Sequence, residues 1–516
     1  MNEVAQVNLP LTSSVFYAFA VYLLIIIGIG IASAQFSSEG IGEFYLADRK
    51  LKRFIVALSA VVSGRSAWLM VGVSGVAFTM GVSAVWAVVG YIVVELFLFL
   101  FVGKRLRRFS EQHDVITLPE YFAVRFGKEE QGKFSPSRSL RVVSVIVITI
   151  FMVAYIAAQF NAGGKAFSAT FDITQTQGVW FTALIVLVYT ILGGYLAVSL
   201  TDMVQAIVMI IALVVLPIIA AIDFGGQSLV LQELASQKGS LIDPVAIGIG
   251  GVIGFLGIGL GSPGQPHILV RYMSVDDPRQ LRYSALIGTI WNVVMAWGAI
   301  YIGLLGRAFY KSKDVLPNQD PENIFPTLAG EHLPSILFGI IIAAILAAIM
   351  STADSQLLVA ASGLVRDIYE KIIKKGEELS QRHLVIMSRV VILILVAIAL
   401  YFALTSSEWV FWLVLFAWAG LGAAFGPPLL LSLFWKNMTI AGALAGMISG
   451  VVIIFVWTQI AALDNFLYEL VPAFIGSTLV SILFSKFGSP PAKAQEILEN
   501  ISAKYHRRKK GRGYRV

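Results

Sequence analysis

Long apolar runs alternate with short polar connections along almost the whole chain. Runs such as Val15 to Ser33 and Gly178 to Ala197 have about 20 residues, enough to cross about 30 Å of hydrocarbon. They are continuously apolar and do not alternate with period two, so they predict helices and not barrel strands. We predict thirteen membrane-spanning helices, at residues 15–35, 54–82, 84–103, 142–164, 177–197, 200–222, 244–266, 284–306, 334–362, 386–404, 409–434, 438–461 and 465–485.

The composition supports an all-α integral membrane protein without a soluble domain. Hydrophobic residues make up 57% of the chain and charged residues 13%, whereas soluble proteins have about 25% charged residues. The absence of Cys excludes disulfides and cysteine-based metal or nucleophile chemistry. We find no nucleotide-binding loop and no metal-hydrolase spacing. We therefore expect neither an enzyme nor an ATP-driven pump.

The distribution of basic residues predicts the orientation in the membrane. If the N-terminus lies outside, the inner loops and the C-terminal tail hold 32 of the 38 Lys and Arg residues, and the outer loops hold 5. This asymmetry favours an external N-terminus, a cytoplasmic C-terminus and a bacterial inner (cytoplasmic) membrane. The first fourteen residues lack the basic start of a signal peptide, so we expect the first span to be retained. The basic tail at 486–516 should face lipid headgroups and solvent, and we expect no nucleic-acid or obligate protein partner.

Two of the predicted spans contain helix-breaking residues at similar positions. The second contains Gly64 between Ser63 and Arg65, and the seventh runs from Gly254 through Gly264 to Pro266. Such residues can unwind a helix and free backbone carbonyls for ions and amides for anions, where the backbone lines a cavity. Kinks without a ligand would look similar. Because the two interrupted spans lie five apart, they suggest two inverted repeats of five helices.

Four ionisable residues fall inside predicted spans: Arg65, Glu95, Asp202 and Asp354. Each would cost about 2.5–3.5 kcal/mol at a bilayer centre without a partner, a cavity or a function. For Glu95 we expect a structural hydrogen bond. Ser351, Asp354 and Ser355 stand at positions i, i+3 and i+4, so their oxygen atoms share one helical face. Such a face suits a hard cation, although packing between helices through small polar residues is an alternative.

At these residues the chain resembles the sodium/solute symporter family, and among its members most nearly the bacterial proline symporters. The likeness covers nearly the whole chain. The matching segments are Leu118-Pro119-Glu120-Tyr121-Phe122, Gly193-Gly194-Tyr195-Leu196-Ala197-Val198-Ser199 with Thr201-Asp202, Gly264-Gln265-Pro266-His267-Ile268-Leu269, Met350-Ser351-Thr352, and Ala417-Trp418-Ala419-Gly420 followed by Gly422 to Pro427.

The resemblance implies a leucine-transporter fold in one transmembrane domain covering residues 1–516. Its core repeats would span about 54–222 and 244–434, with extra spans at 15–35, 438–461 and 465–485. Alternating access would take place around a site at the membrane midplane. The implied main sodium site uses the carbonyls of Val62, Arg65 and Ala348 and the hydroxyls of Ser351 and Thr352. Asp202, Asp354 and Ser355 fall where some members build a second sodium site. The implied solute contacts are Ser66, Ala67, Tyr155, Ile258 and Ser262.

The chain departs from proline symporters at three places. Gly64 replaces an Asp and Arg65 follows it, Ile258 and Ser262 replace aromatic residues of the proline pocket, and Asp354 replaces a hydroxyl residue. A guanidinium about 4 Å from sodium would repel it by about 4 kcal/mol at an effective dielectric constant of about 20. We therefore hypothesise that Arg65 pairs with Asp354, and also Asp202, in the cation's place. Alternatively it binds a substrate carboxylate, or its side chain extends elsewhere.

The sequence thus predicts a secondary active transporter, with sodium-coupled symport of a small carboxylate-bearing solute such as a proline-like amino acid. No cofactor is expected besides Na⁺ as the coupling ion. A sodium-independent or proton-coupled transporter, with Arg65 replacing the bound cation, is the first alternative. A transporter-like solute sensor is an alternative of another class, although such proteins usually carry an output domain. A channel is disfavoured because no repeated filter sequence appears.

Overall fold

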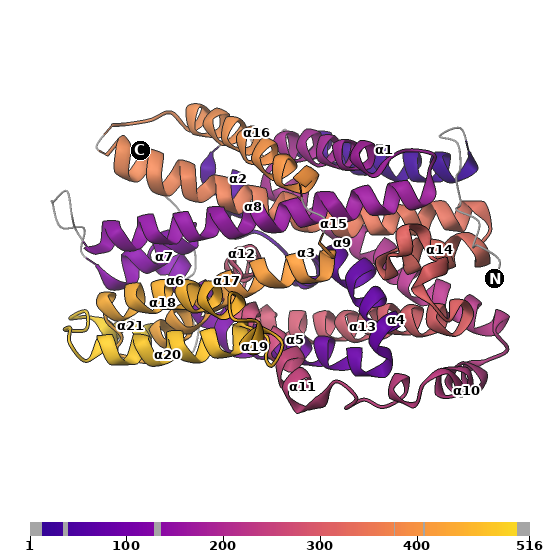
Figure 1. Ribbon diagram of the computed structural model, residues 1–516. Coiled ribbons are helices and arrows are strands. Elements are labelled where there is room, and N and C mark those ends of the chain that lie inside the picture. The colour runs from indigo at the N-terminus through magenta and orange to yellow at the C-terminus, as the bar shows by residue number, and fades with distance from the viewer. Residues whose placement is uncertain (1–12, 35–39, 128–135, 376, 406–407, 503–516) are drawn as a thin grey trace.

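The computed structural model describes residues 13–34, 40–127, 136–375, 377–405 and 408–502. Within these ranges the chain is almost entirely helical, and a single parallel bridge pairs Leu51 with Val275. The long helices run roughly along one direction (Figure 1), with α10 and α14 at one end of the molecule and α7 and α21 at the other. Residues 503–516 of the predicted basic tail lie outside the described residues.

The described residues of the first half of the chain form ten α-helices and four short 3-10 or π-helical segments. These are α1 (Ser14–Ala34), α2 (Ile41–Leu46), η1 (Ala47–Arg49), α3 (Arg53–Ser63), η2 (Trp68–Val73), α4 (Ser74–Met80), η3 (Gly81–Ala84), α5 (Val85–Phe97), η4 (Leu98–Val102), α6 (Gly103–Gln112), α7 (Leu118–Phe126), α8 (Pro136–Thr170), α9 (Gln175–Asp223) and α10 (Gln227–Gln237).

The second half continues with η5 (Gly239–Leu241), α11 (Gly248–Gly257), η6 (Ile258–Gly264), α12 (Pro266–Ser274), η7 (Pro278–Gln280), α13 (Leu281–Tyr310), η8 (Lys313–Val315), η9 (Pro317–Gln319), η10 (Pro321–Asn323), α14 (Ile324–His332), α15 (Ser335–Ser362), η11 (Gly363–Ile373), α16 (Gln381–Thr405), α17 (Val410–Phe434), α18 (Ile440–Thr458), α19 (Ala461–Asp464), α20 (Leu470–Ser485) and α21 (Ala494–Ser502).

Apolar helices coincide with every predicted span. Nine helical segments in the described part of the chain are long and apolar enough to cross a membrane, and four shorter apolar helices fall at the second, fifth, seventh and thirteenth predicted spans. The protein is therefore a multi-pass membrane protein. The exact number of thirteen crossings stays a prediction.

The fifth and sixth spans meet at a different residue from the one predicted. Their helices join within α9 at Gly194, and not at residues 198–199. Gly194 has a φ of 58°, in the left-handed region that favours glycine, so α9 changes direction there. The prediction places the boundary from hydrophobicity alone. The helix instead breaks at Gly194, because a residue without a Cβ adopts a positive φ at little cost.

Helical breaks occur in both predicted interrupted spans. α3 ends at Ser63, and the helix resumes as η2 at Trp68 after a turn in which Ser66 has a φ of 50°. In the seventh span, α11 tightens into the 3-10 segment η6, which contains Pro263. Helix α12 then continues to Ser274, eight residues beyond the predicted end of the span.

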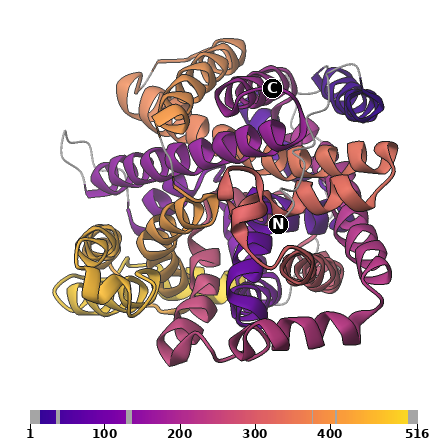
Figure 2. The same cartoon turned by 45° about the vertical axis from the view of Figure 1, so that its right-hand side comes forward.

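The interior consists of α15 and α17 with the broken helices packed against them. α15 contacts α9, α8, α1 and α3, and α17 contacts η6, α8 and η2. Peripheral helices such as α1 and α16 lie at the edge of the molecule in both views (Figures 1 and 2). This arrangement encloses both breaks between longer helices, which is where unwound backbone is tolerated in a membrane protein.

An ordered cap covers one end of the core. It consists of η8, η9, η10 and α14, and Glu322 anchors it: its carboxylate accepts hydrogen bonds from the backbone N–H groups of Val410 and Phe411, each at 2.9 Å. Lys165 of α8 pairs with the same carboxylate at 2.7 Å. Burial raises the pKa of the Glu322 carboxyl, and the ammonium of Lys165 acts in the opposite direction. The cap is thereby joined to α8 and to the start of α17.

Glycine allows two helices to approach closely, so substituting it by alanine tests the helix packing. A Cβ at Gly298 of α13 would overlap the carbonyl group of Leu213 on α9, whereas a Cβ at Gly28 of α1 has no neighbour within 4 Å. We expect Gly298→Ala to destabilise the protein by about 1–3 kcal/mol through overpacking. Gly28→Ala should leave the melting temperature unchanged or raise it. Thermal unfolding of both purified variants in detergent measures this, and equal melting temperatures would contradict the packing.

Candidate substrate and cation site

The break after α3 lies against the polar face of α15. The Ser351 hydroxyl of α15 lies 3.1 Å from the Ala348 carbonyl oxygen and 3.4 Å from the Val62 carbonyl oxygen. The neighbouring Thr352 hydroxyl donates to the Ser63 carbonyl at 3.0 Å. These groups are buried. The structure therefore brings together four of the five groups predicted for the main sodium site. All four offer oxygen atoms, the ligands that a hard cation prefers.

The fifth predicted ligand, the Arg65 carbonyl, lies in the same turn but has a backbone partner. It accepts a hydrogen bond from the Leu69 N–H at 3.0 Å. A carbonyl oxygen has two lone pairs, so this bond leaves one available.

Asp202 and Ser355, predicted for the second sodium site, are joined by a guanidinium. Arg271 of α12 lies 3.1 Å from Asp202 Oδ2 and also donates to the Ser355 hydroxyl. The hydroxyls of Ser59 and Ser63 donate to the same carboxylate oxygen, at 2.6 and 3.2 Å. This network ties α3 and α12 to α9 and α15.

Asp354 borders this network with one oxygen unpaired. Its Oδ1 accepts from the Ser355 hydroxyl at 3.1 Å. Within the described residues, Asp354 Oδ2 and Asp202 Oδ1 are buried without a hydrogen-bond partner. Arg271 therefore pairs with one of two buried carboxylates, and the other, that of Asp354, has no basic partner among the described residues.

Arg65 has different partners from those predicted. Its Nη2 pairs with Glu95 of α5, and its Nε donates to Asn292 Oδ1 of α13 at 2.8 Å. Asn292 Nδ2 in turn donates to Glu95 Oε2 at 2.6 Å. The guanidinium also lies 3.7 Å from the centre of the Tyr91 ring. All four side chains are buried.

The predicted pair of Arg65 with Asp354 or Asp202 is therefore wrong. The turn at Gly64 directs the Arg65 side chain toward α5 and α13, whereas Asp354 lies beside Ser355 on the side of α9 and α12. The structural hydrogen bond expected for Glu95 is confirmed, with Arg65 and Asn292 as its partners.

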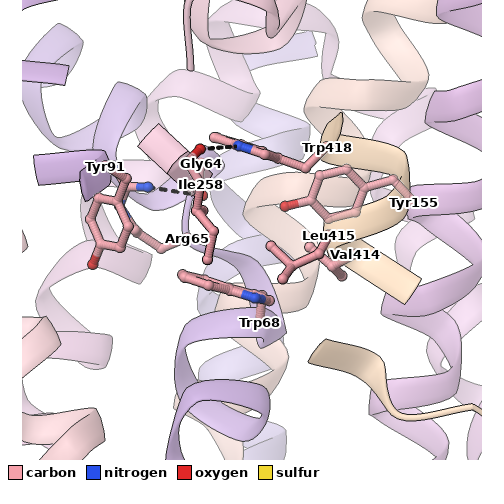
Figure 3. A pocket seen from close by; sticks show the side chains of 9 residues that line it. All are labelled: Gly64, Arg65, Trp68, Tyr91, Tyr155, Ile258, Val414, Leu415 and Trp418. Carbon is pink, nitrogen blue, oxygen red and sulfur yellow. Dashed lines mark hydrogen bonds between the residues drawn. The ribbon is translucent and has the colours of Figure 1, made fainter. Parts of the chain in front are cut away.

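A small cavity lies beside the break (Figure 3). It is lined by Gly64, Arg65, Trp68, Tyr91, Tyr155, Ile258, Val414, Leu415 and Trp418. Figure 3 shows Tyr91 and Tyr155 on opposite sides of this cavity, and the Arg65 guanidinium lies on the side of Tyr91. Its volume of about 10 Å³ is room for about one water molecule. A larger solute therefore requires the surrounding helices to separate.

The predicted solute contacts lie in or near this cavity. Arg65, Tyr155 and Ile258 line it, and the Ser66 hydroxyl lies 3.3 Å from the Tyr155 hydroxyl. The Ala67 N–H donates to Gln159 Oε1 at 3.0 Å. In the described part of the chain, the Ser262 hydroxyl and Gln159 Nε2 are buried without a hydrogen-bond partner.

A larger cavity of about 710 Å³ lies on the α19 side and shares Leu415 with the small one. Trp412, Phe416 and Tyr468 line it, together with three carboxylate residues, Glu408, Asp464 and Glu469. Leu415 therefore lies between the small cavity and a wide, acidic vestibule.

The chain is similar to known proteins over most of its length. The sequence model of the sodium:solute symporter family matches residues 44–450. A sodium/proline symporter of Salmonella typhimurium is 36% identical over 504 residues, which cover 96% of this chain and 98% of the relative. The chain belongs to the sodium:solute symporter family. A high-affinity proline transporter of Bacillus subtilis is 37% identical over 459 residues, covering 89% of this chain and 95% of the relative.

A solved structure supports the fold of this symporter-family protein. A Na⁺-coupled sialic acid symporter in a substrate-bound outward-open state superposes with a TM-score of 0.79 at 16% identity, covering 93% of this chain and 98% of the other. The predicted leucine-transporter fold is confirmed. Family membership also makes the protein a transporter and not an enzyme.

Sequence reasoning missed three contributors to the site: Asn292, Gln159 and Arg271. A signal existed for the partner of Arg65, since Arg65 and Glu95 are opposite charges inside neighbouring predicted spans. Arg271 falls outside the predicted seventh span, which ends at Pro266, and is therefore not among the candidate residues. Asn292 and Gln159 belong to no recognisable sequence motif, so nothing in the sequence indicated their role.

The Arg65–Glu95 pair can be tested by a double-mutant cycle. Breaking a buried pair leaves one uncompensated charge, so we expect Arg65→Met or Glu95→Gln alone to destabilise the protein by about 3–5 kcal/mol. The double variant should recover most of that loss, because neither charge remains. Thermal unfolding in detergent measures the coupling.

The exposed pair of Lys52 with Asp276, at 3.0 Å, provides the control. Lys52→Met with Asp276→Asn should show a coupling of at most about 1 kcal/mol. Additive losses at Arg65 and Glu95 would show that the two charges do not stabilise each other.

Proposed function

We propose that this protein is a secondary symporter that couples the entry of sodium to the uptake of a small carboxylate-bearing solute, of the class of proline-like amino acids, by alternating access. The observation that carries the proposal is the approach of the Val62 and Ala348 carbonyls to the Ser351 hydroxyl at the break between α3 and η2. Five oxygen groups, including the Thr352 hydroxyl and the Arg65 carbonyl, would hold the ion there.

The partners of Arg65 compensate its charge, so the guanidinium does not exclude sodium from the proposed ion site. A free guanidinium at this position would repel a bound cation, but Glu95 supplies a compensating charge and the side chain extends toward Tyr91. The pair is neutral as a whole, so its field at the proposed ion site is that of a dipole. This favours the ordinary symport mechanism over one in which Arg65 replaces the ion.

The second proposed cation site includes Asp202, Asp354 and Ser355. Arg271 neutralises one of the two carboxylates, and the other remains without a basic partner among the described residues. A buried uncompensated charge is expensive, so a monovalent cation or a proton would complete the cluster. A second sodium ion is consistent with this charge count.

For the solute, the unpaired polar groups near the cavity favour an amino-acid-like molecule. The Gln159 amide nitrogen, the Trp68 indole nitrogen and the Ser262 hydroxyl are buried donors without partners in the described chain. They can bind a carboxylate, while Tyr155, Trp418 and Ile258 offer an apolar surface. The sodium/proline symporters among the relatives support this class.

We also propose an orientation of the protein in the membrane and a pair of inverted repeats. With the N-terminus outside in a bacterial inner membrane, the end with α10 and α14 faces outward, and the acidic vestibule is the outer entrance. The two proposed repeats, residues 54–222 and 244–434, place the breaks at corresponding positions.

Uptake into proteoliposomes tests the proposed function. We expect wild-type protein to concentrate radiolabelled proline, or another member of a panel of amino and organic acids, under an inward sodium gradient. A choline or proton gradient alone should give no accumulation. Ser351→Ala should raise the sodium concentration for half-maximal uptake by about tenfold, equivalent to about 1.4 kcal/mol.

Ser362→Ala is the matched control. Ser362 lies on the same helix, and its hydroxyl donates to the Val359 carbonyl away from the proposed site. This variant should retain the wild-type sodium dependence. Equal accumulation in sodium and choline by the wild type would refute sodium coupling and favour the alternative in which Arg65 is the built-in cation.

A further inference from the structure

An apolar groove of about 520 Å³ runs along the outside of the helix bundle between α5 and α13. α10 meets it at one end, through Gln227 and Leu231. Figures 1 and 2 both show α10 and α11 at one edge of the molecule. Both walls belong to segments long and apolar enough to span the membrane, so the groove faces lipid and not water.

The length of the groove matches one leaflet of a bilayer. Its lining on α13 extends from Val293 to Leu304. The eleven steps between these residues, each with a rise of about 1.5 Å, give about 16 Å, which is about half of a 30 Å hydrocarbon core. The groove therefore runs from the α10 end to about the middle of the membrane.

The groove has a buried floor and open margins. Val88 and Ala296 are each 3% exposed, whereas Val93 is 62% and Val293 is 50% exposed. A single extended hydrocarbon chain fits a concave surface of this kind, because it contacts the floor and both walls at once.

Tyr301 lies toward the α10 end of the groove, and Trp297 lies about one helical turn deeper in it. Trp297 and Tyr301 line it with ring centres 5.6 Å apart. The Tyr301 hydroxyl is enclosed and has no hydrogen-bond partner in the described chain. Trp and Tyr concentrate where acyl chains meet headgroups. A ligand with an apolar chain and a polar end would satisfy this hydroxyl.

We propose that the groove is a binding site for one phospholipid, with an acyl chain between α5 and α13 and its ester region at Tyr301 and Gln227. In the proposed topology this lipid comes from the outer leaflet. The site also lies behind the ion-pair network, because α5 carries Glu95 and α13 carries Asn292. The bound chain thus supports the two helices that hold Arg65.

Native mass spectrometry of the full-length protein, extracted from membranes in a mild detergent, tests the site. The wild type should retain one phospholipid that survives moderate collisional activation. Val293→Trp should lose it, because the indole fills the groove. Leu393→Trp on α16 is the matched control, since Leu393 is also 50% exposed but lines none of the cavities described above; it should retain the lipid.

Tyr301→Phe removes the hydroxyl with little change of shape and should weaken retention without abolishing it. This variant keeps the test decisive if Val293→Trp folds poorly. Equal retention by wild type, Val293→Trp and Tyr301→Phe would overturn the proposal and indicate annular lipid only. Retention of a protein-sized mass that Val293→Trp releases would also overturn it, because the occupant would then be a second chain.

Discussion

The structure depends on one constraint: backbone groups released from a helix inside a bilayer need partners. The break from Gly64 to Ala67 interrupts the second span in the protein interior. An unpaired carbonyl in hydrocarbon costs several kcal/mol, so such a break persists only where side chains, an ion or a solute satisfy it. Here α15 provides the hydroxyls of Ser351 and Thr352, and α8 provides the side chain of Gln159. The proposed transport site is the place where this requirement is met.

Charge balance follows from the same low-dielectric environment. Arg65 in the break and Glu95 of α5 compensate each other, and Asn292 of α13 is hydrogen-bonded to both. Arg271 and Asp202 form a second pair, and this one joins α12 to α9. The two pairs connect different helices: the first joins the break after α3 to α5 and α13, and the second joins α12 to α9.

Much of this architecture could be predicted from the sequence, because hydrophobic runs and helix breakers report directly on span positions. The interruptions near Gly64 and Pro263 and the oxygen-rich face of α15 are of this kind. The partner of Arg65 could not be predicted, because side-chain direction depends on how the turn at Gly64 exits the helix. Arg271 lies outside the predicted seventh span because α12 extends that span by eight residues, which include the charged Arg271.

In the proposed mechanism, Arg65 is neutralised by Glu95 and leaves the cation site free for sodium. Equilibrium binding of radioactive sodium to purified wild type and to the charge-neutral double variant Arg65→Met/Glu95→Gln tests it most directly. We predict saturable sodium binding by the wild type and an affinity in the double variant within about threefold of it, a difference below about 1 kcal/mol. Absence of binding in the wild type, with binding gained in the double variant, would show that Arg65 takes the place of the ion.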